Sequence, residues 1–169
     1  TLADSVMASA AAALRAPRDR VQILADVASM RARLDRDKRA TGPLDLKRMS
    51  GGLIDIEFIA QGLLLGFVDP GTQNPTPSTA TLLSDLARAG VLKRADEALL
   101  REAFDLYSDL QQVLRASAVE PLNPETAPPA LQALLCAAAD APSIDAMMKR
   151  LGALSAAVRG IFVQLMGAM

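Results

Sequence analysis

Apolar residues recur along most of this chain at spacings of three and four positions, which is the period of an amphipathic α-helix. Clusters of proline, glycine and polar residues interrupt the pattern, and no stretch shows the sustained period of two that marks a half-buried strand. We therefore expect an all-α fold: a bundle of six or seven helices without a sheet, forming a single helical domain over residues 1–169. The expected helices cover residues 2–15, 17–36, 52–68, 79–88, 96–118, 129–139 and 143–165.

Residues with known preferences for helix ends sharpen these boundaries. Pro17 suits the first position of a helix, and it would place Asp19 in the first turn, where a carboxylate complements the helix dipole. Ser78 or Thr79 can cap the helix predicted over residues 79–88. Gly90 follows that helix, at a position where glycine commonly ends a helix.

The helix predicted over residues 52–68 is apolar nearly all round, so we expect it to lie at the centre of the bundle. Its polar exceptions are Asp55, Glu57 and Gln61. Asp55 lies on one line with Gly62 and Gly66, two positions at which the absence of a side chain would let a neighbouring helix approach closely.

Two carboxylates two residues apart, Asp55 and Glu57, point about 200° apart around a helix. These two alone therefore do not make a paired-carboxylate metal site, and we predict no metal site in the chain. One interpretation is structural: each carboxylate pairs with an arginine of a neighbouring helix, such as Arg31 or Arg33. The other is functional, and for Asp55 it is favoured by the adjacent glycines.

The start of this helix has the chemistry of an anion site. Unpaired backbone N–H groups around Gly51 and Gly52, the positive end of the helix dipole, and the nearby Lys47 and Arg48 could together bind a phosphate or a carboxylate. The alternative interpretation is that Ser50 is an N-cap, the glycines form a tight turn and the basic side chains are solvated.

Composition limits the classes of function. Apolar residues make up 51% of the chain and aromatic residues 3%, which favours helices packed closely through small side chains. A net charge of -1 argues against a nucleic-acid-binding protein, although residues 31–48 contain seven basic and three acidic residues. No apolar run is long enough to cross a membrane, and Cys136 is expected to be a buried, inert thiol. We expect a cytoplasmic protein.

Within the stretch LDLKRMSGGLIDIEFIAQG, from Leu44 to Gly62, Lys47 followed shortly by Gly51 to Gln61 resembles the hallmark of glutamate–ammonia-ligase adenylyltransferase, the enzyme that modifies glutamine synthetase. Residues 27–34 and residues 81–92 are also similar to that family. The resemblance covers roughly residues 17–120, and the remainder fits the family mainly by length and helical pattern.

The resemblance implies a helical domain that follows a catalytic nucleotidyltransferase domain. That family has two such halves, and Ile54-Asp55 stands where the amino-terminal half typically has Arg-Glu, so the chain resembles the carboxy-terminal, adenylylating half. The parent enzyme would transfer AMP from ATP to a tyrosine of glutamine synthetase, using Mg²⁺. Implied partners are the upstream catalytic domain, glutamine synthetase and a PII regulatory protein.

The chain has no histidine and no Gly-Ser turn followed by an Asp-x-Asp strand, so the catalytic domain is expected upstream of Thr1 and the chain alone should be inactive. We expect no bound cofactor and no catalytic residue in it. The residues most expected to face the nucleotide or the active site are Lys47, Arg48, Gly51, Gly52, Asp55 and Glu57. Two alternatives stay open: the helical domain of the related PII uridylyltransferase, and a non-catalytic protein-interaction bundle.

Overall fold

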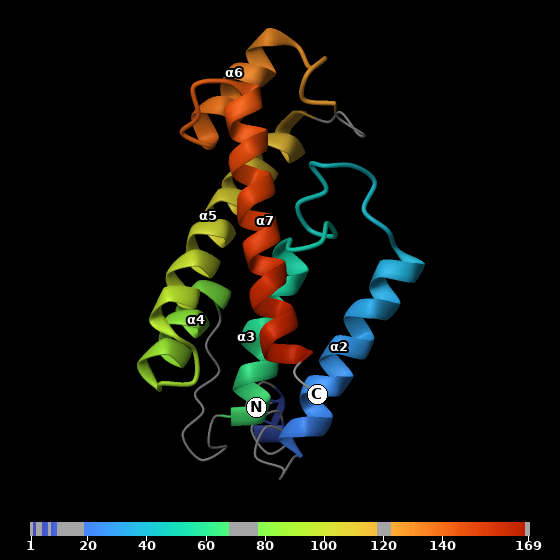
Figure 1. Ribbon diagram of the computed structural model, residues 1–169, viewed down its shortest axis with the longest axis vertical. Coiled ribbons are helices and arrows are strands. Elements are labelled where there is room, and N and C mark those ends of the chain that lie inside the picture. The colour runs from blue at the N-terminus through green and yellow to red at the C-terminus, as the bar shows by residue number, and fades with distance from the viewer. Residues whose placement is uncertain are drawn as a thin grey trace.

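The computed structural model describes residues 19–67, 78–117 and 123–167, together with residues 2, 5, 6, 8 and 9. These parts of the chain contain helices and turns and no strand, which confirms the predicted all-α fold (Figure 1). The helices are α2 (Arg20–Asp37), α3 (Leu53–Phe67), α4 (Thr79–Arg88), α5 (Arg94–Ser117), α6 (Pro129–Ala138) and α7 (Ile144–Met166). Most of the helix predicted over residues 2–15 lies outside the described residues.

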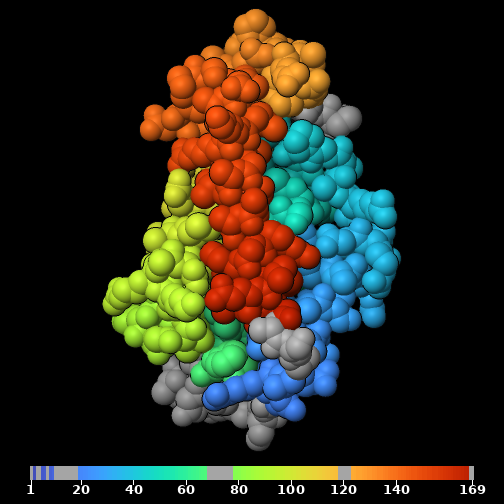
Figure 2. Space-filling model, in the orientation of Figure 1, coloured from blue at the N-terminus to red at the C-terminus, as the bar shows by residue number. Residues whose placement is uncertain are grey.

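The helices α3, α5 and α7 pack against one another and form the centre of the bundle. On one side α2 packs against α3 and α7, while α4 packs against α3 and α5, and α6 covers one end of α5 and α7 (Figure 1). In the space-filling view α7 runs down the middle of the face, between α4 and α5 on one side and α2 on the other (Figure 2). No helix within the described residues is both long and apolar enough to cross a membrane.

The core confirms the hydrophobic pattern of the sequence. In α3, nine of fifteen residues are buried, and this helix contacts α2, α4, α5 and α7, so it is the central helix that its apolar sequence predicted. In α5 the buried residues lie at helical spacing and face the core: they are Leu100, Ala103, Leu106, Tyr107 and Leu110. Cys136 differs from the expectation, because it is a free cysteine that is only partly buried.

Helix α2 begins later than the sequence predicted. Its first residue is Arg20, so Asp19 is the N-cap and does not lie in the first turn. The Asp19 backbone is extended and its carboxylate accepts hydrogen bonds from the N–H groups of Val21 and Gln22, which would otherwise lack partners. Pro17, the predicted first residue, lies outside the described residues.

The other ends mostly agree with the sequence. Gly90 follows α4 in the left-handed conformation, with φ of +74°, as predicted for a helix terminator. Ser78 occupies the N-cap position of α4, but its side chain makes no capping hydrogen bond. Helix α5 begins at Arg94, two residues before the predicted start, because the carbonyl of Lys93 already accepts from the N–H of Glu97.

Gly51 marks the closest approach between the turn before α3 and helix α7. Its φ is +73°, and a Cβ at this position would lie 1.8 Å from the carbonyl oxygen of Ser155 in α7. Gly62 also confirms the expected close packing, since a Cβ there would lie 3.2 Å from the Met166 side chain. Gly66 does not confirm the expected close packing, because no atom lies within 4 Å of the position that a Cβ would occupy there. The backbone contact at Gly51 therefore sets how closely α7 packs on α3.

We predict that Gly51→Ala lowers the free energy of unfolding by more than about 3 kcal/mol, because a methyl group would collide with backbone that cannot move aside. Gly90→Ala is the matched control: it has the same positive φ, but open space around it. It should lose only about 1–2 kcal/mol, which is the cost of the left-handed conformation. Urea unfolding followed by circular dichroism measures both; equal losses would contradict the proposed contact with α7.

Candidate functional site

The turn that precedes α3 is built around Asp45. Its carboxylate accepts from the N–H of Thr41 at 3.1 Å and of Arg48 at 3.2 Å, and it forms an ion pair with the Arg48 guanidinium at 2.8 Å. Its backbone carbonyl accepts from the N–H of Met49 at 2.8 Å. These bonds hold the side chains of the turn in place before the helix begins.

The first N–H groups of α3 are already bound within the chain. The N–H of Leu53 donates to the carbonyl of Leu46 at 2.9 Å, and the N–H of Ile54 donates to the carbonyl of Lys47 at 3.2 Å. The N–H of Gly52 donates to the carbonyl of Met49 at 2.9 Å. One of the two interpretations from the sequence left these donors unpaired for a phosphate, whereas the turn folds back and supplies backbone carbonyls to them.

Asp55 caps this helix start from inside. One carboxylate oxygen, Oδ2, accepts from the N–H of Gly51 at 2.6 Å, and the other, Oδ1, accepts from Nε of Arg31 in α2. The Asp55 side chain is fully buried. The capping role that sequence analysis considered for Ser50 therefore belongs to Asp55, while Ser50 itself is exposed.

Arg31 is as deeply buried as its partner, and all parts of its guanidinium are bound. Besides Asp55, it pairs with the carboxylate of Asp35 one turn further along α2. Its remaining nitrogen donates to the backbone carbonyls of Arg48 at 3.3 Å and Met49 at 3.2 Å. A buried charge is stable only when it is paired and hydrogen-bonded in this way, so Arg31 joins α2, the turn and α3.

A second arginine reaches the same carboxylate from α7. Nη1 of Arg159 lies 3.5 Å from Oδ2 of Asp55, and its guanidinium also stacks on the ring of Phe162. The prediction that Asp55 pairs with an arginine of a neighbouring helix is confirmed for Arg31, whereas Arg33 is exposed. Whether Asp55 also acts in chemistry stays a separate hypothesis.

Glu57 and Asp55 have different surroundings, as their angular separation predicted. Asp55 is fully buried and Glu57 is only partly buried, and within the described part of the chain no hydrogen bond or ion pair involves the Glu57 carboxylate. Among these residues there is also no group of three or more cysteine and carboxylate side chains that could hold a metal ion.

Tyr107 of α5 lies close enough to Asp55 to sense its charge. Its side chain is buried, and no described group forms a hydrogen bond with its hydroxyl. Burial raises the pKa of this phenol above its ordinary value of 10.0, and the negative charge of Asp55 raises the pKa further. Nothing in the local sequence indicates this electrostatic contact, which the packing of α5 on α3 creates.

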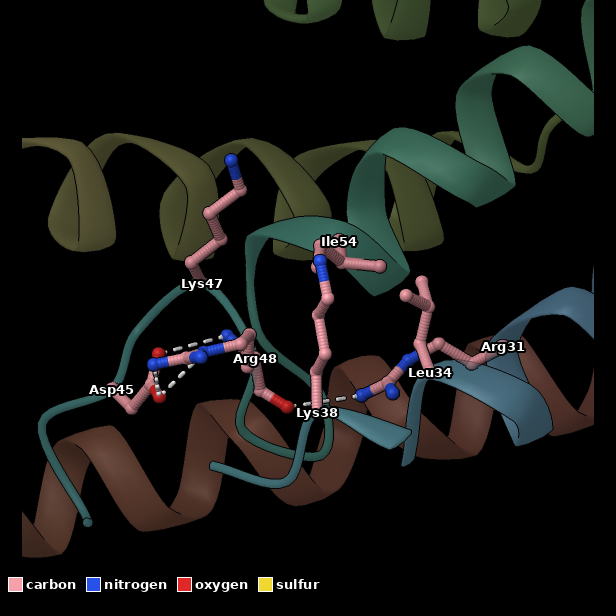
Figure 3. Close-up of a pocket in the computed structure, with 7 residues that line it drawn as sticks. All are labelled: Arg31, Leu34, Lys38, Asp45, Lys47, Arg48 and Ile54. Carbon is pink, nitrogen blue, oxygen red and sulfur yellow. Dashed lines mark hydrogen bonds and ion pairs between the residues drawn. The ribbon is translucent and has the colours of Figure 1, made fainter. Parts of the chain in front are cut away.

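A pocket of about 400 Å³ opens beside the buried ion pair, between the end of α2 and the turn before α3 (Figure 3). It is lined by Arg31, Leu34, Lys38, Asp45, Lys47, Arg48 and Ile54. Of the residues expected to face a nucleotide, Lys47 and Arg48 line this pocket, while Gly51, Gly52, Asp55 and Glu57 do not. Lys38 was not among the expected residues, since only the packing of α2 on α3 brings it to the pocket.

A family model described as GlnD PII-uridylyltransferase matches residues 21–166. The chain belongs to this family. The match includes the carboxy-terminal part of the chain, which sequence analysis had related to a family only by length and helical pattern.

Besides this family model, the chain is similar to curated proteins named bifunctional glutamine synthetase adenylyltransferase/adenylyl-removing enzyme. Those of Bradyrhizobium sp. strain BTAi1 and Rhodopseudomonas palustris strain BisB5 are 39% and 38% identical to the chain over 91% and 92% of its length. The enzyme of Xanthobacter autotrophicus strain Py2 is 34% identical over 89%. The resemblance read from the hallmark segment is confirmed.

The chain spans only 16% of the length of the first two of these relatives. It is therefore similar to a small piece of each adenylyltransferase. No solved structure matches the chain.

We predict that Asp55→Asn destabilises this member of the family by about 3–5 kcal/mol, because the buried Arg31 loses its buried anionic partner and keeps only the partly exposed Asp35. Glu102→Gln is the matched control: Glu102 pairs with Arg150 at 2.8 Å, but both side chains are largely exposed. That change should cost less than about 1 kcal/mol. Chemical denaturation measures both, and a loss for Asp55→Asn no larger than for Glu102→Gln would refute the central role of the buried pair.

The raised pKa of Tyr107 predicts a loss of stability in alkali. Because the folded-state pKa exceeds the unfolded value, the stabilisation is complete below pH 10.0 and falls as pH rises toward the folded-state pKa, by about 1.4 kcal/mol per pH unit. Tyr107 is the sole tyrosine, so its phenolate absorbance reports this ionisation alone.

Tyr107→Phe should remove this pH dependence. It should also raise the free energy of unfolding near neutral pH by about 1 kcal/mol, because it deletes a buried hydroxyl that no described residue hydrogen-bonds. Destabilisation by this variant near neutral pH would show that the hydroxyl has a partner after all.

Proposed function

We propose that this chain is the helical domain of the carboxy-terminal, adenylylating half of a glutamine synthetase adenylyltransferase, acting in the bacterial cytoplasm. The observation that carries the proposal is the 39% identity, over 91% of the chain, to a relative with that name. The Ile54-Asp55 pair supports the assignment to the carboxy-terminal half. The parent enzyme would transfer AMP from ATP to a tyrosine of glutamine synthetase.

In this reaction the tyrosine hydroxyl gives up its proton and its oxygen bonds to the α-phosphorus of ATP, while the bond from that phosphorus to the bridging oxygen breaks and releases pyrophosphate. An upstream nucleotidyltransferase domain would carry the chemistry and hold Mg²⁺, which would offset phosphate charge there. The helical domain would contribute positive charge. Lys47 lines an open pocket beside Arg48, whose own charge is paired with Asp45, so the Lys47 ammonium group can act on the negative charge of the leaving phosphates.

The same geometry supports two different roles within the hallmark segment, packing for Gly51 and Asp55 and phosphate binding for Lys47. Gly51 lies against the backbone of α7, and Asp55 is bound by Arg31, by Arg159 and by the N–H of Gly51. These residues would hold the turn in shape, so that Lys47 is presented at the pocket. In this proposal Asp55 acts through the position of the turn and does not touch the nucleotide.

We predict that Lys47→Met, placed in the full-length enzyme, reduces AMP transfer to glutamine synthetase about tenfold or more, because one charge-assisted contact to phosphate is lost. The melting temperature should not change, since Lys47 is exposed. Lys93→Met is the matched control: Lys93 is exposed in the turn between α4 and α5 and should leave transfer unchanged. Wild-type transfer rates in the Lys47 variant would show that this end of the domain does not serve the active site.

A second candidate function is docking, in which the bundle binds glutamine synthetase or a PII protein and the hallmark segment only packs. The packing roles of Gly51 and Asp55 favour it. A third is the equivalent domain of a PII uridylyltransferase, which the description of the matching family favours. Capture of purified glutamine synthetase by this chain alone would support docking, and transfer of UMP rather than AMP by the full-length enzyme would support the third.

A further inference from the structure

The pocket between α2 and the turn before α3 has an excess of positive charge. Its lining includes four cationic side chains and one carboxylate. The carboxylate, Asp45, is paired with Arg48, and the buried Arg31 is paired with Asp55 and Asp35. The charges of both arginines are therefore balanced by carboxylates of the chain itself.

The two lysines of the pocket have no such partner. Within the described residues, no hydrogen bond or ion pair involves the ammonium group of Lys38 or that of Lys47. Lys38 is the C-cap of α2, and Lys47 lies in the turn before α3. Figure 3 shows both side chains extending in the same direction: Lys47 points away from the bonded pair of Asp45 and Arg48, and Lys38 runs past Arg48 to end beside Ile54.

The spacing of these lysines depends on bonds deeper in the protein. Arg31 donates to the carbonyls of Arg48 and Met49, which ties the α2 helix to the turn that carries Lys47. The side chains of Leu34 and Ile54 complete the lining and reduce contact with water, which strengthens an ionic interaction. Two unpaired ammonium groups over a partly apolar floor fit an anion that carries more than one negative charge.

The size of the pocket limits the occupant to a small molecule. A volume of about 400 Å³ lies within the usual range for small-ligand sites. A long nucleic acid would need an extended basic surface, and the net charge of the chain is -1. Lysine ammonium groups bind phosphate as point charges, so two of them suit adjacent phosphates.

We infer that Lys38 and Lys47 together bind an oligophosphate in this pocket, such as the β- and γ-phosphates of a nucleoside triphosphate or the pyrophosphate derived from it. The inference rests on the proposed function for the source of the ligand, and it adds Lys38 as a binding residue from a different helix. The N–H groups at the start of α3 take no part, because backbone carbonyls and Asp55 already bind them.

The test is isothermal titration of the 169-residue chain with inorganic pyrophosphate at constant ionic strength. We expect one site, with Lys38→Met and Lys47→Met each weakening binding about tenfold and the double variant abolishing it. Lys93→Met should bind as the wild type does. All three positions are exposed, so thermal unfolding should show the same fold in every variant. Competition with ATP then identifies the ligand of this oligophosphate site. If ATP displaces pyrophosphate, the ligand is the nucleoside triphosphate; if ATP does not displace it, the ligand is free pyrophosphate.

The inference is overturned if the wild type does not bind pyrophosphate, if binding survives in the double variant, or if Lys93→Met weakens it as much. Its failure is distinguishable from failure of the proposed function. Loss of pyrophosphate binding together with unchanged AMP transfer in the full-length Lys47 variant would contradict the function and leave the site standing. Reduced transfer without any effect of Lys38→Met on pyrophosphate binding would contradict the site alone.

Discussion

The buried ion pair between Arg31 and Asp55 is the interaction on which the rest of this structure depends. It joins α2 to α3, and the spare donors of Arg31 bind the carbonyls at Arg48 and Met49 in the turn between them. The second oxygen of Asp55 binds the N–H of Gly51 and attracts Arg159 from α7. Removing either charge would leave the other buried with only its second partner, Asp35 for Arg31 or Arg159 for Asp55, so three helices and one turn share a single electrostatic centre.

This centre separates two roles within one short segment. The glycines and Asp55 make packing contacts and hydrogen bonds inside the protein. Lys47, in the same turn before α3, remains exposed at the pocket. A rigid turn matters for such a site, because a charge contributes most to binding when its position is set before the ligand arrives. The buried pair thus gives the exposed lysines a defined place, although it does not itself reach the pocket opening.

The family relationship is consistent with this arrangement. The chain matches about the same fraction of the first two adenylyltransferases, 16%, and within that piece α3 to α7 share one hydrophobic core against which α2 packs. In the proposed function, a bundle with its own core would support a neighbouring catalytic domain without taking part in bond making. The basic pocket at the α2–α3 end is the surface whose charge suits contact with a nucleotide.

Hydrophobic periodicity by itself determined the helices and their buried faces. The central place of α3 followed from it, and the buried residues of α5 lie at the same spacing, because the buried face of a helix depends on residues three and four positions apart in the local sequence. Sequence also named Arg31 as one of two candidate partners for Asp55. Only the tertiary structure decided between them, and only it revealed the roles of Arg159, Tyr107 and Lys38. These side chains meet across long stretches of chain, so their contacts are set by how α2, α5 and α7 pack around α3, which no local pattern encodes.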